Sequence, residues 1–403
     1  MSPDDETLGG GGLFVSLFTS DDVARETSDA AWLQAMLDAE SALAGAEAGC
    51  GVIEAESAEA IALACEAAGL DAVGIGRASR LSGNPVIPLL AALRARLDPE
   101  TAARLHHGAT SQDILDTALM LVSSRSMGFV ARDLERAAAA AGSLAVQHRE
   151  TLEVARTLLQ PALPTTFGLR AAGWGNALLT ALERLELLRS CLPAQLGGAA
   201  GTLDMLGEAG QDVRQAFAAA LGLAPHPLSW HSDRQPVAEL GSALALACGV
   251  SGKIGRDVSL LSMGELAEVH EPFEPGRGAS SAMPHKRNPA LSSLLMANAR
   301  RAPNLAATLT SCLDVELDRS PGTWQAEWLT ITELLRAAGG SASIAAELLE
   351  GLEVDARTMA GHVEVLGELV LDEQTDPRTY LGSAGAFVDA VTARLLERKA
   401  GAP

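Results

Sequence analysis

Apolar positions in this chain recur at the three- and four-residue spacing of amphipathic helices. Near the N-terminus, the capping residues Thr27, Ser28 and Asp29 precede such a run, and Gly51 follows it. This pattern predicts a helix that begins near Asp29 and ends near Gly51. Alternating runs of β-branched residues, which would predict strands, are nearly absent. The sequence therefore predicts an all-α fold.

Three later stretches predict unusually long helices, because no proline interrupts them: 113–148, 166–192 and 237–269. At about 1.5 Å per residue the last would be on the order of 50 Å long, and helices of this length usually pack in bundles. Its apolar residues follow the steps of a buried helical stripe; they are Val237, Leu240, Leu244, Ile254, Val258, Leu261 and Val269. Its glycines would weaken the helix unless they allow close helix packing, which is the explanation we favour; they are Gly249, Gly252, Gly255 and Gly264.

Shifts in composition divide the chain into three predicted domains. Residues 1–105 form an N-terminal helical domain, residues 106–352 a central long-helix bundle, and residues 353–403 a short C-terminal helical domain. With 403 residues, of which 48% are hydrophobic, the chain can bury a substantial core in two or three such domains.

Charge and motif content exclude several classes of partner. The formal net charge of −21 argues against binding to nucleic acid or to an anionic membrane, so an anionic substrate requires a local cationic pocket. Charges interrupt the apolar stretches, and we expect no membrane span. The five cysteines lack a CxxC pair, which is typical of reduced thiols in the cytoplasm. No metal, dinucleotide or phosphate-loop motif is present, so we expect neither metal nor cofactor.

The segment most informative about chemistry is 271–289, which reads EPFEPGRGASSAMPHKRNP. Its glycines allow backbone movement, its serine hydroxyls can exchange a proton, and its lysine and asparagine can hold a carboxylate. A solvated surface loop would have a similar composition. The residues alone leave these two interpretations equally good.

The stretch SSAMPHKRNP in this loop resembles the loop shared by the fumarase/aspartase superfamily. The resemblance assigns proton transfer to Ser280 and places Lys286 and Asn288 beside it in the catalytic group. Ser281 and Met283 are implied as further substrate contacts. It also implies three helical domains, with a central bundle shared in a homotetramer and active sites built from segments of three subunits.

A second segment, HHGATSQDILDT at 106–117, resembles the part of this superfamily that binds a substrate carboxylate. The resemblance makes His106, Thr110 and Ser111 substrate contacts. On chemistry alone, hydroxyls beside free amide donors at a helix start either bind an anion or cap the helix. His231 and Arg319, in two further matching segments, are additional candidates; Arg319 could equally pair with an acidic neighbour.

A third segment, ARTLLQPALPTTFG at 155–168, resembles the superfamily stretch in which a histidine protonates the leaving group. Thr157 and Gln160 are implied substrate contacts, but Leu158 occupies the position of the histidine. A leucine cannot transfer a proton, so a leaving group that must be protonated is disfavoured.

By resemblance the chain acts on a small polycarboxylate. The implied reaction is cycloisomerisation of 3-carboxy-cis,cis-muconate to γ-carboxymuconolactone in protocatechuate breakdown, the β-ketoadipate pathway, since a carboxylate leaves without a proton. The alternatives are a β-elimination lyase of the same superfamily that expels a stable anion, and a catalytically silent structural protein.

Overall fold

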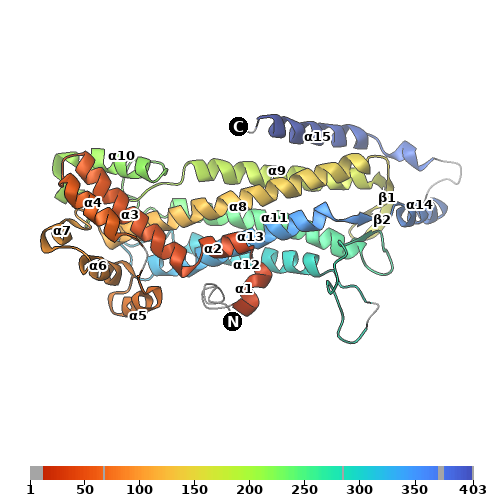
Figure 1. The fold of residues 1–403 in the computed structure, drawn as a ribbon. Coiled ribbons are helices and arrows are strands. Elements are labelled where there is room, and N and C mark those ends of the chain that lie inside the picture. The colour runs from red at the N-terminus through yellow and green to blue at the C-terminus, as the bar shows by residue number, and fades with distance from the viewer. Residues whose placement is uncertain (1–11, 67–68, 284–285, 371–375, 402–403) are drawn as a thin grey trace. The chain divides into compact units, whose positions relative to one another are not determined.

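The computed structural model describes residues 12–66, 69–283, 286–370 and 376–401, which are mostly helical (Figure 1). They form two compact units, neither of which is continuous in sequence. Unit 1 takes the described residues of Met1–Phe129, Leu185–Leu244 and Pro303–Arg336; unit 2 takes those of Val130–Arg184, Ala245–Ala302 and Ala337–Pro403. The three consecutive domains and the homotetramer expected from the sequence stay predictions.

Unit 1 contains short helices and the first or last parts of long ones. Its own helices are α1 (Gly12–Phe18), α2 (Asp21–Glu26), α3 (Asp29–Gly49), α4 (Ala55–Ala64), α5 (Ala72–Ser82), α6 (Val86–Arg94), α7 (Pro99–Arg104), the 3-10 helix η2 (Asp204–Ala209) and α10 (Gly210–Ala220). Long helices that supply residues to both units are α8 (Ser111–Gln147), α9 (Phe167–Ser190), α11 (Gln235–Leu261), α12 (Ala290–Ser311) and α13 (Thr323–Glu350).

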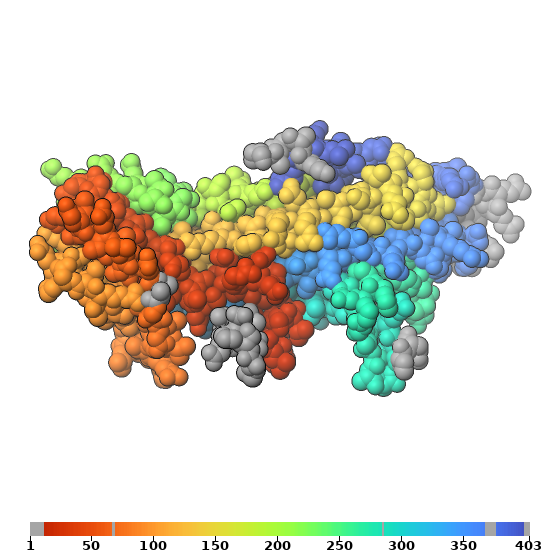
Figure 2. All heavy atoms as spheres, in the orientation of Figure 1, coloured from red at the N-terminus to blue at the C-terminus, as the bar shows by residue number. Residues whose placement is uncertain are grey.

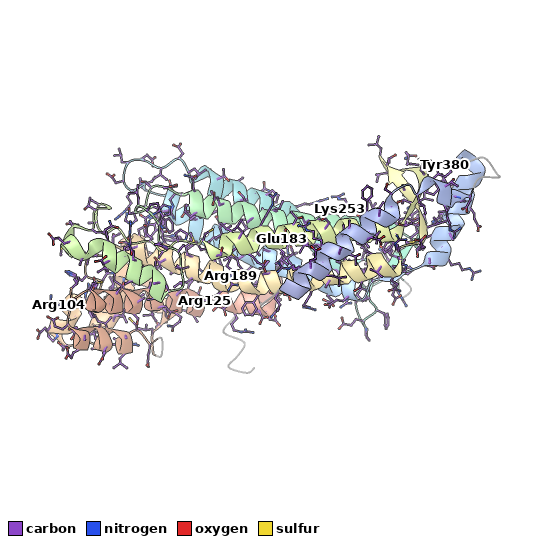
Figure 3. All side chains as sticks on the ribbon, turned by 90° about the horizontal axis from the view of Figure 1, so that it is seen from above. Arg104, Arg125, Glu183, Arg189, Lys253 and Tyr380 are labelled. Carbon is purple, nitrogen blue, oxygen red and sulfur yellow. The ribbon has the colours of Figure 1, made fainter. Side chains whose placement is uncertain are left out.

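Unit 2 adds short strands and the C-terminal helices to its parts of the long helices. The strands β1 (Leu152–Thr157) and β2 (Gln160–Thr166) form one antiparallel pair, and β3 (Val269–His270) and β4 (Glu353–Val354) form another. The remaining elements are α14 (Ala356–Val370), the 3-10 helix η3 (Pro377–Tyr380) and α15 (Ala384–Gly401). Arg394 of α15 donates to Glu183 of α9 at 2.5 Å; Glu183 is labelled in Figure 3.

Helix α3 confirms the first predicted helix. The Ser28 hydroxyl accepts from the Ala31 N–H at 3.2 Å, which satisfies one of the free amides of the first turn. Leu33, Met36 and Leu37 are buried, as their spacing predicts. The sequence did not predict that two carboxylates of α3, Glu40 and Glu47, would each be only 1% exposed.

The predictions for the long helices are confirmed at α8 and α9 and are wrong at the C-terminal end of α11. This helix ends at Leu261 instead of continuing to Val269. The chain turns at Ala267, whose φ is +48°, and Val269 then pairs with Val354 in a short strand. Val269 is therefore in a strand and not in α11, but it is buried like the apolar residues of the α11 stripe. Burial of an apolar residue at helical spacing therefore did not require helical backbone here.

Close helix packing is confirmed for two of the four glycines named above. A Cβ on Gly252 would lie 2.2 Å from the Ala299 Cβ of α12, and one on Gly255 would lie 2.9 Å from the Leu295 Cβ. Only glycine permits this approach of the two helices. Within the described part of this chain no helix approaches Gly249, or Gly264 beyond the end of α11, where an added Cβ would meet nothing within 4 Å.

The β1–β2 hairpin is the largest departure from the predicted all-α pattern. Thr157 pairs with Gln160, so Leu158 and Leu159 form a two-residue turn. Both leucines have positive φ, 52° and 63°, as this tight turn demands, although leucine rarely adopts such values. No hairpin signal is present in the sequence, because the turn lacks glycine and asparagine and β2 contains two prolines.

Helices α8 and α11 are long and apolar enough to cross a membrane by length and composition alone, contrary to the sequence expectation. In the apolar window of each, 78% and 56% of the residues are buried within the protein. Core helices of soluble proteins pass the same test, so these two helices are weak evidence for a membrane span.

Candidate active site

The loop that carries Ser280 is closed at two points within unit 2. At its base, the Glu271 carboxylate accepts from the Leu291 and Ser292 N–H groups at 3.0 and 2.8 Å, and so caps the start of α12. Further out, the N–H groups of the Asn288 backbone and side chain both donate to the Gly278 carbonyl at 2.9 Å. In Figure 2 the described part of this loop, coloured blue-green, stands out from the helices of unit 2.

Gly278 is required at this closure. Its φ is +64°, and a Cβ there would lie 2.2 Å from the Asn288 carbonyl oxygen. The bond to Gly278 occupies one of the two N–H donors of the Asn288 side chain, which leaves its second N–H and its carbonyl oxygen for a substrate. Asn288 therefore holds the loop closed, a role that the sequence did not suggest.

The Ser280 hydroxyl lies beside backbone donors beyond this closure. The Met283 N–H donates to its oxygen at 3.1 Å and the Ala282 N–H at 3.4 Å. Ser280 is half-buried, whereas Ser281 and Met283 are exposed. Lys286 is also exposed, and no described residue forms an ion pair with its ammonium group. The loop thus presents the Ser280 hydroxyl with two amide donors, and the Lys286 ammonium group.

A second group of candidate residues gathers at the start of α8, in unit 1. The Thr110 N–H donates to Asp113 at 2.9 Å, which is half of a capping box. The Thr110 hydroxyl accepts from Arg319 Nη1 at 3.1 Å, so Arg319 lies beside this helix start. Its other nitrogen donates to the Ala199 carbonyl at 3.2 Å. Among the described residues, Arg319 has no acidic partner; the hydroxyl, the guanidinium and the helix start together form a candidate anion site.

Asp113 organises the loops around that helix start. Besides Thr110, its carboxylate accepts from the N–H groups of Gly197 and Gly198, each at 2.9 Å, and from His231 Nε2 at 2.6 Å. His231 is 4% exposed, and a Cβ on Gly197 would lie 3.0 Å from its ring. The His231 ring is therefore enclosed, and its contact with the anion site passes through Asp113.

His106 lies just before the same helix start. Its Nδ1 donates to Glu40 of α3 at 2.7 Å, and its backbone φ is +63°, which is unusual for histidine. Burial lowers the pKa of His106, but the Glu40 carboxylate more than offsets this, and the net pKa is raised above its usual value. His106 therefore favours the cationic form.

The hairpin tip carries the third group. Thr157 and Gln160 are exposed at the ends of β1 and β2, and Leu158 between them is 97% exposed. Arg156, the preceding residue, makes two hydrogen bonds to buried Glu268, at 2.8 and 2.7 Å. Glu268 also accepts from His362 of α14 at 2.7 Å. The tip is therefore a firmly held projection that ends in an apolar side chain.

The predicted site residues thus fall into three groups, one in unit 1 and two in unit 2. The structure brings Thr110, Arg319 and His231 together through Asp113. Sequence reasoning missed Asp113, Glu40 and the Gly197–Gly198 amides. Asp113 could have been found, because an acidic residue three positions after a threonine cap is a capping-box signal. Glu40 could not, since nothing in the sequence places it beside His106.

The arrangement offers hydroxyls, amide donors and cations, which suit proton transfer beside an anionic group. Among the described residues, no three His, Cys, Asp or Glu side chains are grouped so that they could hold a metal ion.

A family model described as lyase matches residues 18–303. The chain belongs to the fumarase/aspartase superfamily. Members of this superfamily with similar sequences include a nitrosuccinate lyase of Streptomyces davaonensis, which is 44% identical over 93% of this chain and 81% of its own length. A 3-carboxy-cis,cis-muconate cycloisomerase of Pseudomonas aeruginosa is 43% identical over 90% of this chain and 80% of its own.

Solved structures of the superfamily agree with the fold. The 3-carboxy-cis,cis-muconate lactonizing enzyme of Pseudomonas putida matches with a TM-score of 0.89 and 35% identity, over 96% of this chain and 99% of that one. A fumarate lyase from Mesorhizobium matches with a TM-score of 0.83 and 30% identity, over 93% and 98%. The chain is therefore an enzyme of this superfamily, as its sequence motifs suggested.

Proposed function

We propose that this enzyme interconverts 3-carboxy-cis,cis-muconate and γ-carboxymuconolactone, with Ser280 as the proton-transfer group. The observation that carries the proposal is Leu158, an apolar side chain at the hairpin tip, where a leaving group would otherwise meet a histidine. A carboxylate leaves as a stable anion and needs no acid. Similarity to cycloisomerases at 40–43% identity supports the same substrate, and with it a place in the breakdown of aromatic compounds.

In the lactone-forming direction, one carboxylate oxygen adds to a carbon of the diene, and the adjacent carbon takes a proton from Ser280. In the reverse direction the Ser280 alkoxide removes that proton, which gives a carbanion stabilised by its neighbouring carboxylate, and the ring carboxylate departs. The Met283 and Ala282 N–H groups would stabilise the alkoxide, because both already point at the Ser280 oxygen. Lys286 would stabilise the charge that accumulates on the carboxylate.

The anion site at the start of α8 would hold a second carboxylate. Thr110, Ser111 and Arg319 supply hydroxyl and guanidinium donors, and the helix start adds a partial positive charge. His106 supplies a further cation. A substrate with three carboxylates is suited to such separate cationic groups.

A second candidate is elimination of nitrite from nitrosuccinate. The specific observation that favours it is the 44% identity to a nitrosuccinate lyase, together with Leu158, because nitrite also leaves as a stable anion. Ser280 would remove the proton beside one carboxylate, and the electron pair would expel nitrite to leave fumarate. In both candidate reactions Ser280 is the base, and the leaving group departs without being protonated by an acid.

The experiment that separates them offers each substrate to purified wild-type enzyme and follows its products. Loss of the diene absorbance of the muconate, with lactone as the single product, supports the first candidate. Nitrite and fumarate released in equal amounts from nitrosuccinate support the second. Ser280→Ala should reduce kcat by about 10²–10⁴-fold with the true substrate, and Ser281→Ala, its neighbour, should retain far more. Equal activity of Ser280→Ala and wild type would refute the assigned base.

We further propose that copies of the chain assemble as a tetramer through the faces of α9 and α11 in unit 2. These faces line an open cavity of about 740 Å³ whose walls include Gly173, Leu246, Gly249 and Lys253, the last labelled in Figure 3. Leu246 is 41% exposed, and Gly249 has open space beside it, so another helix could approach closely. Wild type should then sediment with four times the chain mass of 41.6 kDa.

The assembly is tested with one added charge on that face. Leu246→Glu should dissociate the tetramer, whereas Leu63→Glu, on the exposed surface of α4, should leave it intact. A monomeric wild type with full activity at high dilution would contradict both the assembly and sites shared between subunits.

A further inference from the structure

Glu40 and His106 form a buried pair beside the candidate anion site in unit 1. Glu40 projects from α3 and its side chain is fully buried, while the His106 side chain is 12% exposed. One Glu40 oxygen accepts from His106 Nδ1 at 2.7 Å. The other Glu40 oxygen is buried without a hydrogen-bond partner among the described residues. His106 is thus the group that compensates this carboxylate.

The remaining ring nitrogen of His106 is free to meet a ligand. No described residue bonds to Nε2. The positive φ of His106 places the ring against Glu40 at the end of the segment that precedes α8. A backbone held in this uncommon region indicates that the surroundings, here the bond to Glu40, fix the side chain in place.

We propose that Glu40 is a positioning residue that keeps the His106 ring oriented and cationic, so that Nε2–H binds an anionic group of the substrate. The inference rests on the proposed function in one respect: the anionic group bound by His106 is taken to be a carboxylate of a small polycarboxylate substrate. Glu40 itself does not touch the substrate. It acts through His106, as carboxylates that fix the tautomer and charge of a functional histidine do.

The charged groups around His106 support this assignment. Glu40 on α3 and Asp113 on α8 both favour the cationic ring, while Arg94 on α6 opposes it. Glu47, two turns beyond Glu40 on α3, does not add a second negative charge near neutral pH. Burial, followed by the charge of Glu40, raises the pKa of Glu47 to about 8. Of the two buried glutamates of α3, Glu40 is therefore the one that acts on His106.

The test compares Glu40→Gln with Glu47→Gln. Glutamine at position 40 can still accept from Nδ1–H, so the geometry is kept while the charge is lost. Glu47→Gln is the matched control, because it makes the same substitution on the same buried helix without touching His106. The ring titration of His106 is followed by NMR in protein labelled with ¹³C at histidine Cε1, with a His106→Gln sample to assign the signal.

We expect the His106 midpoint to fall by about 1–3 pH units in Glu40→Gln and to stay in place in Glu47→Gln. With whichever of the two candidate substrates wild type turns over, Glu40→Gln should raise KM at pH 7.5 by about tenfold and leave kcat within about twofold. Its KM should also rise at a lower pH than that of wild type. A purely structural role would alter kcat and thermal stability without moving either pH profile.

An unchanged His106 midpoint in Glu40→Gln, or an equal shift in Glu47→Gln, would overturn the proposal. A shifted midpoint with an unchanged KM would overturn the substrate-binding role of His106. If wild type turns over neither substrate, the proposed function fails, and the NMR titration still decides whether Glu40 sets the charge of His106.

Discussion

The buried carboxylate of Glu47 lowers the free energy of unfolding of this protein as the pH rises from about 4.5 to about 8. Its side chain is 1% exposed, one of its oxygens has no partner among the described residues, and its pKa is raised to about 8 by burial and by Glu40. The folded state therefore holds a proton that the unfolded chain releases above the ordinary pKa near 4.5. The stabilising contribution of the protonated Glu47 should be greatest below that pH and should be lost as the pH rises to about 8.

The substitution Glu47→Gln isolates this effect, because glutamine resembles the protonated carboxyl group in shape and cannot ionise. Each pH unit between the two pKa values costs wild type about 1.4 kcal/mol of unfolding free energy. Between pH 5.5 and 7.5, Glu47→Gln should gain about 2.7 kcal/mol on wild type. For a chain of 403 residues that unfolds in one step, this corresponds to about 3 °C in Tm.

The assay is differential scanning calorimetry of both proteins at pH 5.5, 6.5 and 7.5, at one chain concentration so that any assembly contributes equally. The difference in Tm should grow with pH in favour of Glu47→Gln. A difference that is constant across this range would show that Glu47 does not change protonation on folding. A difference that grows in favour of wild type would mean that an ionised Glu47 has a stabilising partner.

Three further substitutions test other parts of the structure. Gly278→Ala forces a Cβ into the loop closure at a left-handed backbone position; kcat/KM should fall at least tenfold with Tm within about 2 °C, and retained activity would show that the closure opens freely. Gly252→Ala should lower the free energy of unfolding, measured with denaturant, by about 1–3 kcal/mol, because the added Cβ would collide with Ala299 although alanine has the better helix propensity. Gly45→Ala, at an exposed position of α3 with open space around it, should instead raise that free energy by up to about 1 kcal/mol. Arg234→Met removes the cation shared by the buried carboxylates of Asp116 and Glu327, and should lower the free energy of unfolding by about 3–5 kcal/mol at pH 7.5. The loss should be smaller at pH 5, where these carboxylates can take up protons. A loss that does not depend on pH would refute this explanation.

Much of the helical fold could be predicted, because its signals are local. The cap at Ser28, the proline-free stretches and the stripe of α11 gave helices whose ends mostly agree with α3, α8 and α9. The β1–β2 hairpin could not be predicted. Its turn places Leu158 and Leu159 at positive φ, which local propensity disfavours, so contacts elsewhere in unit 2, including the Arg156–Glu268 pair, must hold it.

The candidate site divides in the same way. The motif residues Ser280, Thr110 and Leu158 were proposed from the sequence, and Leu158 is the basis for proposing an anionic leaving group. The amide donors at Ser280 could not be found, because they depend on how the loop turns back on its own hydroxyl. The bond from Asn288 to Gly278 likewise depends on the loop closure.

The sequence by itself determined that the chain is a helical enzyme of this superfamily and that position 158 holds a leucine, which cannot act as an acid. The serine base stays a prediction. Only the tertiary structure decided the partners and charge states of the site. Glu40, His106 and Asp113 come from segments that folding brings together, and the two carboxylates raise the pKa of the buried His106 ring. Local pattern specifies helices and chemistry, while desolvation and long-range contact set the electrostatics.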